Sequence, residues 1–153
     1  MVVIAEIGHI EGKAAIGVEV KSPDVRPLIP DAFETGLAAL RRRGLYPINH
    51  TVVIKNELIA AHPGLAADVF DAFAAAKRVY LDRLLGGTIE KPTEFDALHQ
   101  RVLQITGDPL PYGIAPNREV IEELIGHAVT QGIISKPVTV EALFAPSTLA
   151  LTG

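Results

Sequence analysis

Three side chains that can donate or accept hydrogen bonds fall within five consecutive residues: Tyr46, Asn49 and His50. They belong to the stretch G-L-Y-P-I-N-H-T-V-V-I-K, residues 44–55, in which Pro47 fixes one backbone dihedral. An imidazole can give or take a proton near neutral pH, and a phenol or an amide can hold the polar groups of a ligand. We therefore expect any catalytic or binding function to lie in this stretch, with His50 as the leading candidate.

Each polar candidate also has an ordinary structural explanation. His50, at the entry to an apolar strand, could be buried and hydrogen-bonded to the backbone. Tyr112 in P-Y-G could bind a ligand or cover the core as a loop aromatic. Arg118, one residue beyond a helix cap, could hold a carboxylate through two hydrogen bonds or face solvent. Spacing alone leaves both explanations open for each residue.

The other histidines do not form a recognisable metal site. His9, His62, His99 and His127 have no zinc-signature spacing, and the chain has no cysteine, so we predict no metal site. We expect His99 and His127 to face solvent. There is no G-x-S-x-G, P-loop or G-x-G-x-x-G motif either.

The composition indicates one globular domain. The chain has 153 residues, of which 48% are hydrophobic and 21% charged, and its net charge is −4. This charge gives no reason to expect nucleic-acid binding, and the one basic run, residues 41–43, is expected to be a solvated helix surface. No apolar run is long enough to span a membrane, and the absence of cysteine and of an export signal favours the cytoplasm.

The periodicity predicts a helix-rich α/β protein. Strands are expected at 1–7, 14–20 and 51–55; helices are expected at 32–43 after Asp31, 56–62 from Asn56, 64–85, 94–105 after Thr93, 118–131 after Asn117, and 138–145 started at Thr139. A stiff loop with three prolines occupies residues 107–116. About three strands are too few for a complete doubly wound domain.

Four motifs, in order, resemble the 4,5-dihydroxyphthalate decarboxylases of bacteria. They are K-A-A-I-G-V with the following S-P-D-V-R-P-L-I-P-D, then G-L-Y-P-I-N-H-T-V-V-I-K, D-P-L-P-Y-G-I-A-P-N-R, and V-E-A-L-F-A-P-S-T-L. The similarity runs from about residue 12 to the end of the sequence. The resemblance implies the fold of a type II periplasmic binding protein, in which two α/β lobes enclose a cleft.

Members of this family are much longer than the present chain, which resembles their C-terminal part. Residues 1–153 are therefore expected to form a single partial domain, a second-lobe segment followed by C-terminal helices, without the N-terminal lobe. A homodimer or a partner chain could supply the missing half of the cleft. A cleft with one wall does not exclude water from a reaction.

The resemblance implies loss of one carboxylate as CO₂ from an aromatic ortho-dicarboxylate, giving protocatechuate without a cofactor. On this hypothesis His50 acts as the acid or base, Tyr46, Asn49 and Tyr112 contact the small aromatic carboxylate, and Arg118 clamps a carboxylate. The alternative is a non-catalytic solute-binding fragment for a small aromatic or anionic ligand, because one superfold serves both roles. A structural remnant that only dimerises is a third possibility.

Overall fold

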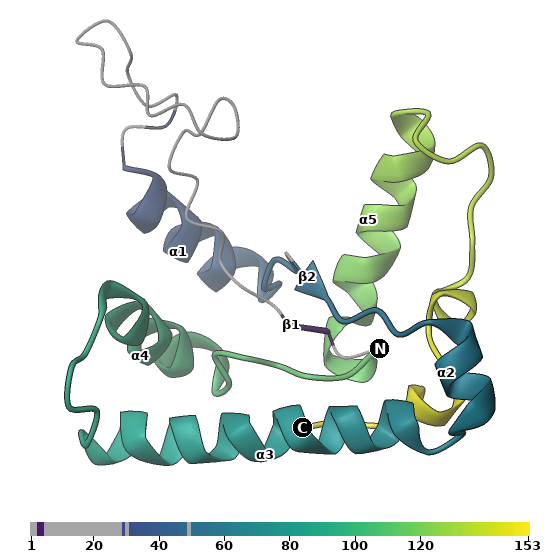
Figure 1. Ribbon diagram of the computed structural model, residues 1–153. Helices are drawn as coiled ribbons and strands as arrows, with labels where there is room; N and C mark the ends of the chain where they lie inside the picture. The colour runs from purple at the N-terminus through teal and green to yellow at the C-terminus, as the bar shows by residue number, and fades with distance from the viewer. Residues whose placement is uncertain (1–2, 5–28, 30, 49) are drawn as a thin grey trace, which may run out of the picture.

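The computed structural model describes residues 3–4, 29, 31–48 and 50–153, and these residues are mostly helical (Figure 1). The elements, with short 3₁₀ helices written η, are β1 (Val3–Ile4), α1 (Ala32–Arg43), β2 (His50–Thr51), α2 (Asn56–Ala61), α3 (Leu65–Gly86), α4 (Glu94–Thr106), η1 (Ala115–Asn117), α5 (Arg118–Thr130), η2 (Val140–Leu143) and η3 (Pro146–Thr148). The predicted helix-rich character is confirmed.

The longest helix, α3, forms the base on which other elements rest (Figure 1). α2 leads into its N-terminal end, α4 folds back over its C-terminal half, and η3 lies against it. α1 contacts α4, while α5 contacts η1 and η2 at the opposite end of the molecule. The chain therefore has two groups of helices above one long helix.

The helix boundaries follow from local signals that the sequence contains. α1 ends at Gly44, whose positive φ of 67° lets its N–H donate to the oxygen of Leu40 at 2.8 Å. α4 begins with a capping box, in which the hydroxyl of Thr93 and the carboxylate of Asp96 satisfy each other's backbone N–H groups. Asp31 stands at the start of α1 as predicted, but its side chain makes no capping hydrogen bond.

The strand predicted at 51–55 is shorter in the structure, where β2 comprises His50 and Thr51. β1 and β2 pair antiparallel, with Val3 opposite Thr51 and Ile4 opposite His50. The expected strand over 51–55 is wrong beyond Thr51: residues 52–55 are not paired as a strand with any part of the chain that the structure describes, and Val52 packs instead against a buried cluster that includes Phe70 of α3. The strand expected at 14–20 lies outside the described residues. Within the part of the chain that the structure describes, β1 and β2 form a two-stranded ladder, and not an extended sheet.

Two further predictions about helix ends need correction. Asn117 precedes α5, but its amide does not cap the helix: it donates to the oxygens of Pro111 and Gly113, both at 2.8 Å. The C-terminal helix expected over 138–145 is instead the short 3₁₀ helix η2. Thr139 does start it, since its hydroxyl accepts from the N–H of Ala142.

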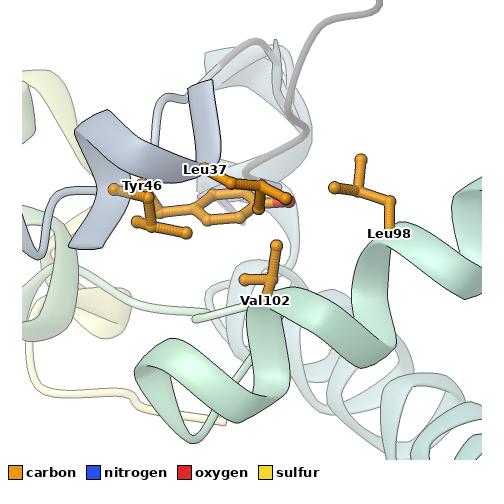
Figure 2. Close-up of a cluster of buried hydrophobic side chains, with 5 residues drawn as sticks. Leu37, Tyr46, Leu98 and Val102 are labelled. Carbon is orange, nitrogen blue, oxygen red and sulfur yellow. The ribbon is translucent and has the colours of Figure 1, made fainter. Parts of the chain in front are cut away.

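The buried side chains form three clusters, each built from elements distant in sequence. The α1–α4 cluster (Figure 2) consists of Leu37, Leu40, Tyr46, Leu98 and Val102. The α5 cluster consists of Ile114, Ile121, Val140 and Phe144. The α3 cluster consists of Phe70, Ala74 and Tyr112. Burial of each valine, leucine, isoleucine or phenylalanine side chain in these clusters stabilises the fold by about 1.5–3 kcal/mol before the entropic cost of ordering the chain.

Candidate functional site

The stretch 44–55 crosses all three clusters. Tyr46 belongs to the α1–α4 cluster, Ile48 packs against both that cluster and the α5 cluster, and Val52 packs against the α3 cluster. These inward positions lie an even number of residues apart, as expected for an extended chain with one buried face. The backbone of the stretch is therefore fixed at several points along its length.

His50 lies between these anchors. It opens β2, pairs with Ile4 across the ladder, and is exposed to solvent. Because His50 is exposed, the structural explanation given above for this residue, a buried histidine, is excluded. A fixed backbone and an exposed imidazole meet the first requirement for proton transfer to a ligand, which is access. The catalytic role of His50 itself stays a prediction.

Tyr46 is placed differently from His50. Only 4% of this residue is exposed, and its ring lies between α1 and α4, among Leu37, Leu98 and Val102 (Figure 2). A substrate contact through this phenol would require the α1–α4 cluster to open. Asn49 lies outside the described residues. The predicted ligand contacts of both residues stay predictions.

Tyr112 is buried in the α3 cluster, below a buried cation. The ammonium of Lys77 lies 5.2 Å from the centre of the Tyr112 ring, within range of a cation–π contact. Burial, and secondarily the nearby charge of Asp108, raise the pKa of the Tyr112 phenol, which keeps it protonated at neutral pH. Tyr112 thus covers the core, as its structural explanation suggested, while a role in binding is untested.

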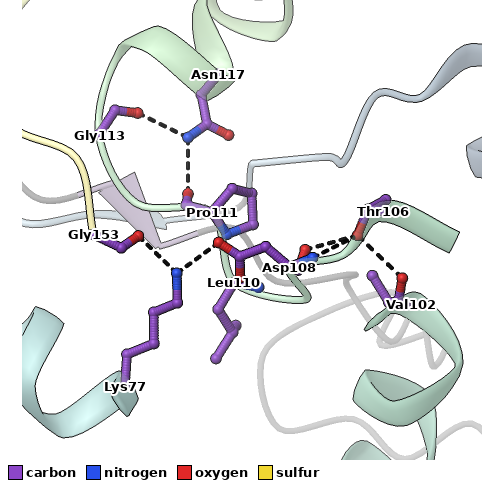
Figure 3. A network of polar contacts seen from close by, with 9 residues as sticks. All are labelled: Lys77, Val102, Thr106, Asp108, Leu110, Pro111, Gly113, Asn117 and Gly153. Atoms are coloured by element: carbon purple, nitrogen blue, oxygen red, sulfur yellow. Dashed lines mark hydrogen bonds and ion pairs between the residues drawn. The ribbon is translucent and has the colours of Figure 1, made fainter. Parts of the chain in front are cut away.

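Lys77 is the centre of a polar network that the sequence reading did not identify (Figure 3). Its Nζ donates to Asp108 Oδ2 and to the backbone oxygen of Gly153, each at 2.6 Å. The second oxygen of Asp108 accepts from the N–H of Leu110 at 2.9 Å. The sequence contains one signal for this network: Lys77 occupies a position on the apolar stripe of α3, and a buried charge at such a position needs a partner.

The remaining predicted site residue, Arg118, lies on the surface at the start of α5. Its guanidinium donates to Glu141 at 2.5 Å and to Glu122 at 3.4 Å. The carboxylate of Glu141 raises the pKa of Arg118, so the guanidinium stays charged. A substrate carboxylate would have to compete with these two glutamates. The described structure gives Arg118 two ion-pair partners, Glu122 and Glu141, and neither Tyr46 nor Tyr112 is one of them.

A second polar group joins α3 to α4. The hydroxyl of Tyr80 lies 2.8 Å from both Asp96 Oδ1 and His99 Nδ1, and the two rings meet edge to face. His99 is therefore half-buried and bonded, contrary to the expectation that it faces solvent, whereas His127 is exposed as predicted. Hydrogen bonds from Thr93, first the backbone N–H and then the hydroxyl, lower the pKa of the Asp96 carboxyl.

Asp96 settles the proton positions in this group. Its ionised carboxylate must receive the single proton of the Tyr80 hydroxyl, so the ring nitrogen of His99 donates to the Tyr80 oxygen. Burial, followed by the hydrogen bond to Asp96, raises the pKa of Tyr80, which therefore stays a neutral donor. The group links two helices and holds no ionised phenol.

Two site types find no support in the described part of the chain. Among these residues, no three histidine, aspartate or glutamate side chains are grouped so that they could hold a metal ion. Of the described helices, none combines the length and the apolar character needed to cross a bilayer.

Comparison with known proteins identifies a distantly similar enzyme. The chain is similar to a 4,5-dihydroxyphthalate decarboxylase from Comamonas testosteroni, with 29% identity over 130 residues. The matched region is 83% of this chain and 39% of that enzyme, so the chain spans about two-fifths of the relative's length. No protein-family model matches the sequence. The identity supports a distant relationship between the two proteins.

Proposed function

We propose that this chain is part of a decarboxylase that acts on an aromatic ortho-dicarboxylate such as 4,5-dihydroxyphthalate. The observation that carries the proposal is the similarity to the decarboxylase over 83% of the chain. Within that similarity, His50 supports the proposal structurally, because it is exposed on a backbone anchored at both ends. The fold proposed with it is that of a type II periplasmic binding protein, of which this chain supplies one side of the cleft.

In the proposed reaction, the bond between one ring carbon and its carboxylate breaks and CO₂ leaves. The electron pair of that bond remains on the ring, and a proton from an acid takes the place of the carboxylate. A ring hydroxyl para to this carbon pushes electrons into the ring when it is deprotonated. His50 is proposed as the group that moves the proton, a contribution typically worth about 10²–10⁴-fold in rate.

The second wall of the cleft is proposed to come from residues beyond this chain, either a partner chain or a second copy. The relative is more than twice as long as the region it shares with this chain, which supports an additional lobe. Exclusion of water by that lobe would strengthen every electrostatic contact with the substrate. We propose that turnover is therefore slower in the isolated chain than in a two-lobed enzyme.

The test uses the purified chain with 4,5-dihydroxyphthalate. We expect the ligand to shift the NMR signals of the His50 ring and to be converted slowly to protocatechuate. His50→Gln should lower product formation at least 100-fold, while His62→Gln, which changes another exposed histidine, should have no effect.

Three outcomes would count against this proposal. Equal turnover by the wild type and His50→Gln would remove His50 from the mechanism. Saturable binding without any product, even at long incubation, would favour the solute-binding function. A titration in which no signal of His50 moves would argue against a site at this residue.

A further inference from the structure

The described residues line a hollow of about 280 Å³ between α1 and α5. Residues 45–47, which directly follow Gly44, form part of its wall. Its lining comes from three places in the sequence: α1, the junction after it, and the first turns of α5. The lining residues are Gly36, Ala39, Leu40, Arg43, Leu45, Tyr46, Pro47, Val120 and Glu123. Most of this lining is apolar, and its two charged members are Arg43 and Glu123.

The space exists because small residues face it. Gly36 has no side chain, and a Cβ at that position would meet no atom within 4 Å. Ala39 adds only a methyl group one turn further along α1. A cavity of about 150 Å³ lined by apolar side chains is large enough for benzene, so this hollow has room for one substituted aromatic ring.

The polar edge of the hollow is a guanidinium with spare donors. Arg43 Nη2 lies 2.9 Å and 2.7 Å from the two carboxylate oxygens of Glu123, so one terminal nitrogen makes both of these contacts. A guanidinium has five N–H donors, and the three on Nη1 and Nε take no part in this pair. The Arg43 side chain is also 52% exposed, so a ligand can reach it.

From this geometry we infer that the hollow binds a small aromatic carboxylate. The ring would lie against Ala39 and Val120, and the carboxylate would accept a hydrogen bond from Nη1 of Arg43. The choice of an aromatic acid rests on the proposed function, whereas the need for an apolar body with one anionic group rests on the lining itself. This assigns the carboxylate clamp to Arg43, in place of Arg118, whose guanidinium is held by two glutamates.

Glu123 sets a limit on the ligand. Its carboxylate shares the guanidinium, and it also lies 3.7 Å from the ring of His127. A second negative charge of the ligand that pointed toward Glu123 would be repelled. The site therefore favours an acid that presents one carboxylate to Arg43 and directs any other substituent away from α5.

The experiment measures binding of phthalate, which lacks the ring hydroxyls required for turnover, by NMR titration of the whole chain. We expect saturable binding with signal changes along α1 and the first turns of α5. Arg43→Gln should weaken binding at least tenfold, the usual effect of losing a charge-assisted pair. The matched control is Arg42→Gln, which removes an exposed arginine outside the lining and should leave affinity unchanged.

Two further variants separate binding from a structural effect. Glu123→Gln breaks the same ion pair but keeps Arg43, so affinity should be maintained or increased. Ala39→Leu fills the hollow and should abolish binding while thermal unfolding stays cooperative. Equal losses in Arg43→Gln and Glu123→Gln, or unchanged binding in Ala39→Leu, would overturn the inference.

The same titration distinguishes this inference from the proposed function. His50→Gln should leave phthalate binding unaltered while lowering turnover at least 100-fold. Turnover that survives Arg43→Gln would disprove the site at Arg43 and leave the decarboxylase proposal intact. Phthalate binding that depends on Arg43, together with unchanged turnover in His50→Gln, would support the site and contradict the proposed role of His50.

Discussion

Lys77 shows how a single charged side chain is accommodated inside this chain. Its side chain is 5% exposed, yet the ammonium has an anion, a backbone oxygen and an aromatic face as partners. The anion and the aromatic ring belong to the proline-rich loop and the backbone oxygen to Gly153, so one lysine connects α3 to that loop and to the final residue of the sequence. Its charge is tolerated because the partners offset the cost of desolvation.

The network predicts unequal effects for its two charged members. Lys77→Met removes the buried charge and leaves Asp108, which is 37% exposed and can be hydrated, so we expect a loss of about 1–3 kcal/mol in unfolding free energy. Asp108→Ala leaves the buried ammonium without its anion and should cost more, about 3–5 kcal/mol. Urea unfolding followed by circular dichroism measures both. A larger loss in Lys77→Met than in Asp108→Ala would contradict this account.

At the scale of elements, the long helices were predictable because their signals are local and repeated. The apolar stripe of α3 continues over several turns, and the capping residue of α4 and the glycine after α1 mark their ends. The extent of the strand predicted at 51–55 was not predictable, because a β-branched run has the same sequence pattern whether it pairs with another strand or packs its side chains against a core. Pairing is a long-range property that this run does not encode.

The start of α4 makes stability depend on pH. The folded pKa of Asp96 lies below its ordinary value of 3.8, so its contribution is complete above that pH and is lost as the pH falls through the folded pKa. We expect the difference in unfolding free energy between the wild type and Asp96→Asn to shrink between pH 5 and pH 2. Denaturant titrations at several pH values measure it. A difference that stays constant would show that the carboxylate charge is not involved.

At the scale of the molecule, the candidate site was only partly predictable. The 44–55 stretch was identified from its residue types, and its exposed histidine agrees with that choice. Tyr112 and Arg118 were also predicted from their residue types. Residue type alone does not reveal that Tyr112 is buried in the core or that Arg118 is paired with two glutamates. The pairing of Arg43 with Glu123 joins residues eighty positions apart, so no local pattern contains it.

Two glycines should respond in opposite ways to the same change. Gly113 has a φ of 103°, and a Cβ there would lie 2.3 Å from the backbone oxygen of Leu151, so Gly113→Ala should destabilise the fold by about 2 kcal/mol or more. Gly36 lies within α1 with open space around it, so Gly36→Ala should stabilise by about 0.8–1 kcal/mol. Thermal unfolding of both variants measures this, and two shifts of the same sign would contradict it.

The 44–55 stretch also determines how cooperatively the molecule opens. Ile48 lies against two clusters, and a few residues later Val52 lies against the third, so these contacts couple clusters that are otherwise built from separate elements. Subglobal opening depends on such couplings, because a unit without them unfolds on its own. Detachment of this one stretch therefore removes the contact that Ile48 makes between the α1–α4 cluster and the α5 cluster, and amide exchange in α1 would then become independent of exchange in α5.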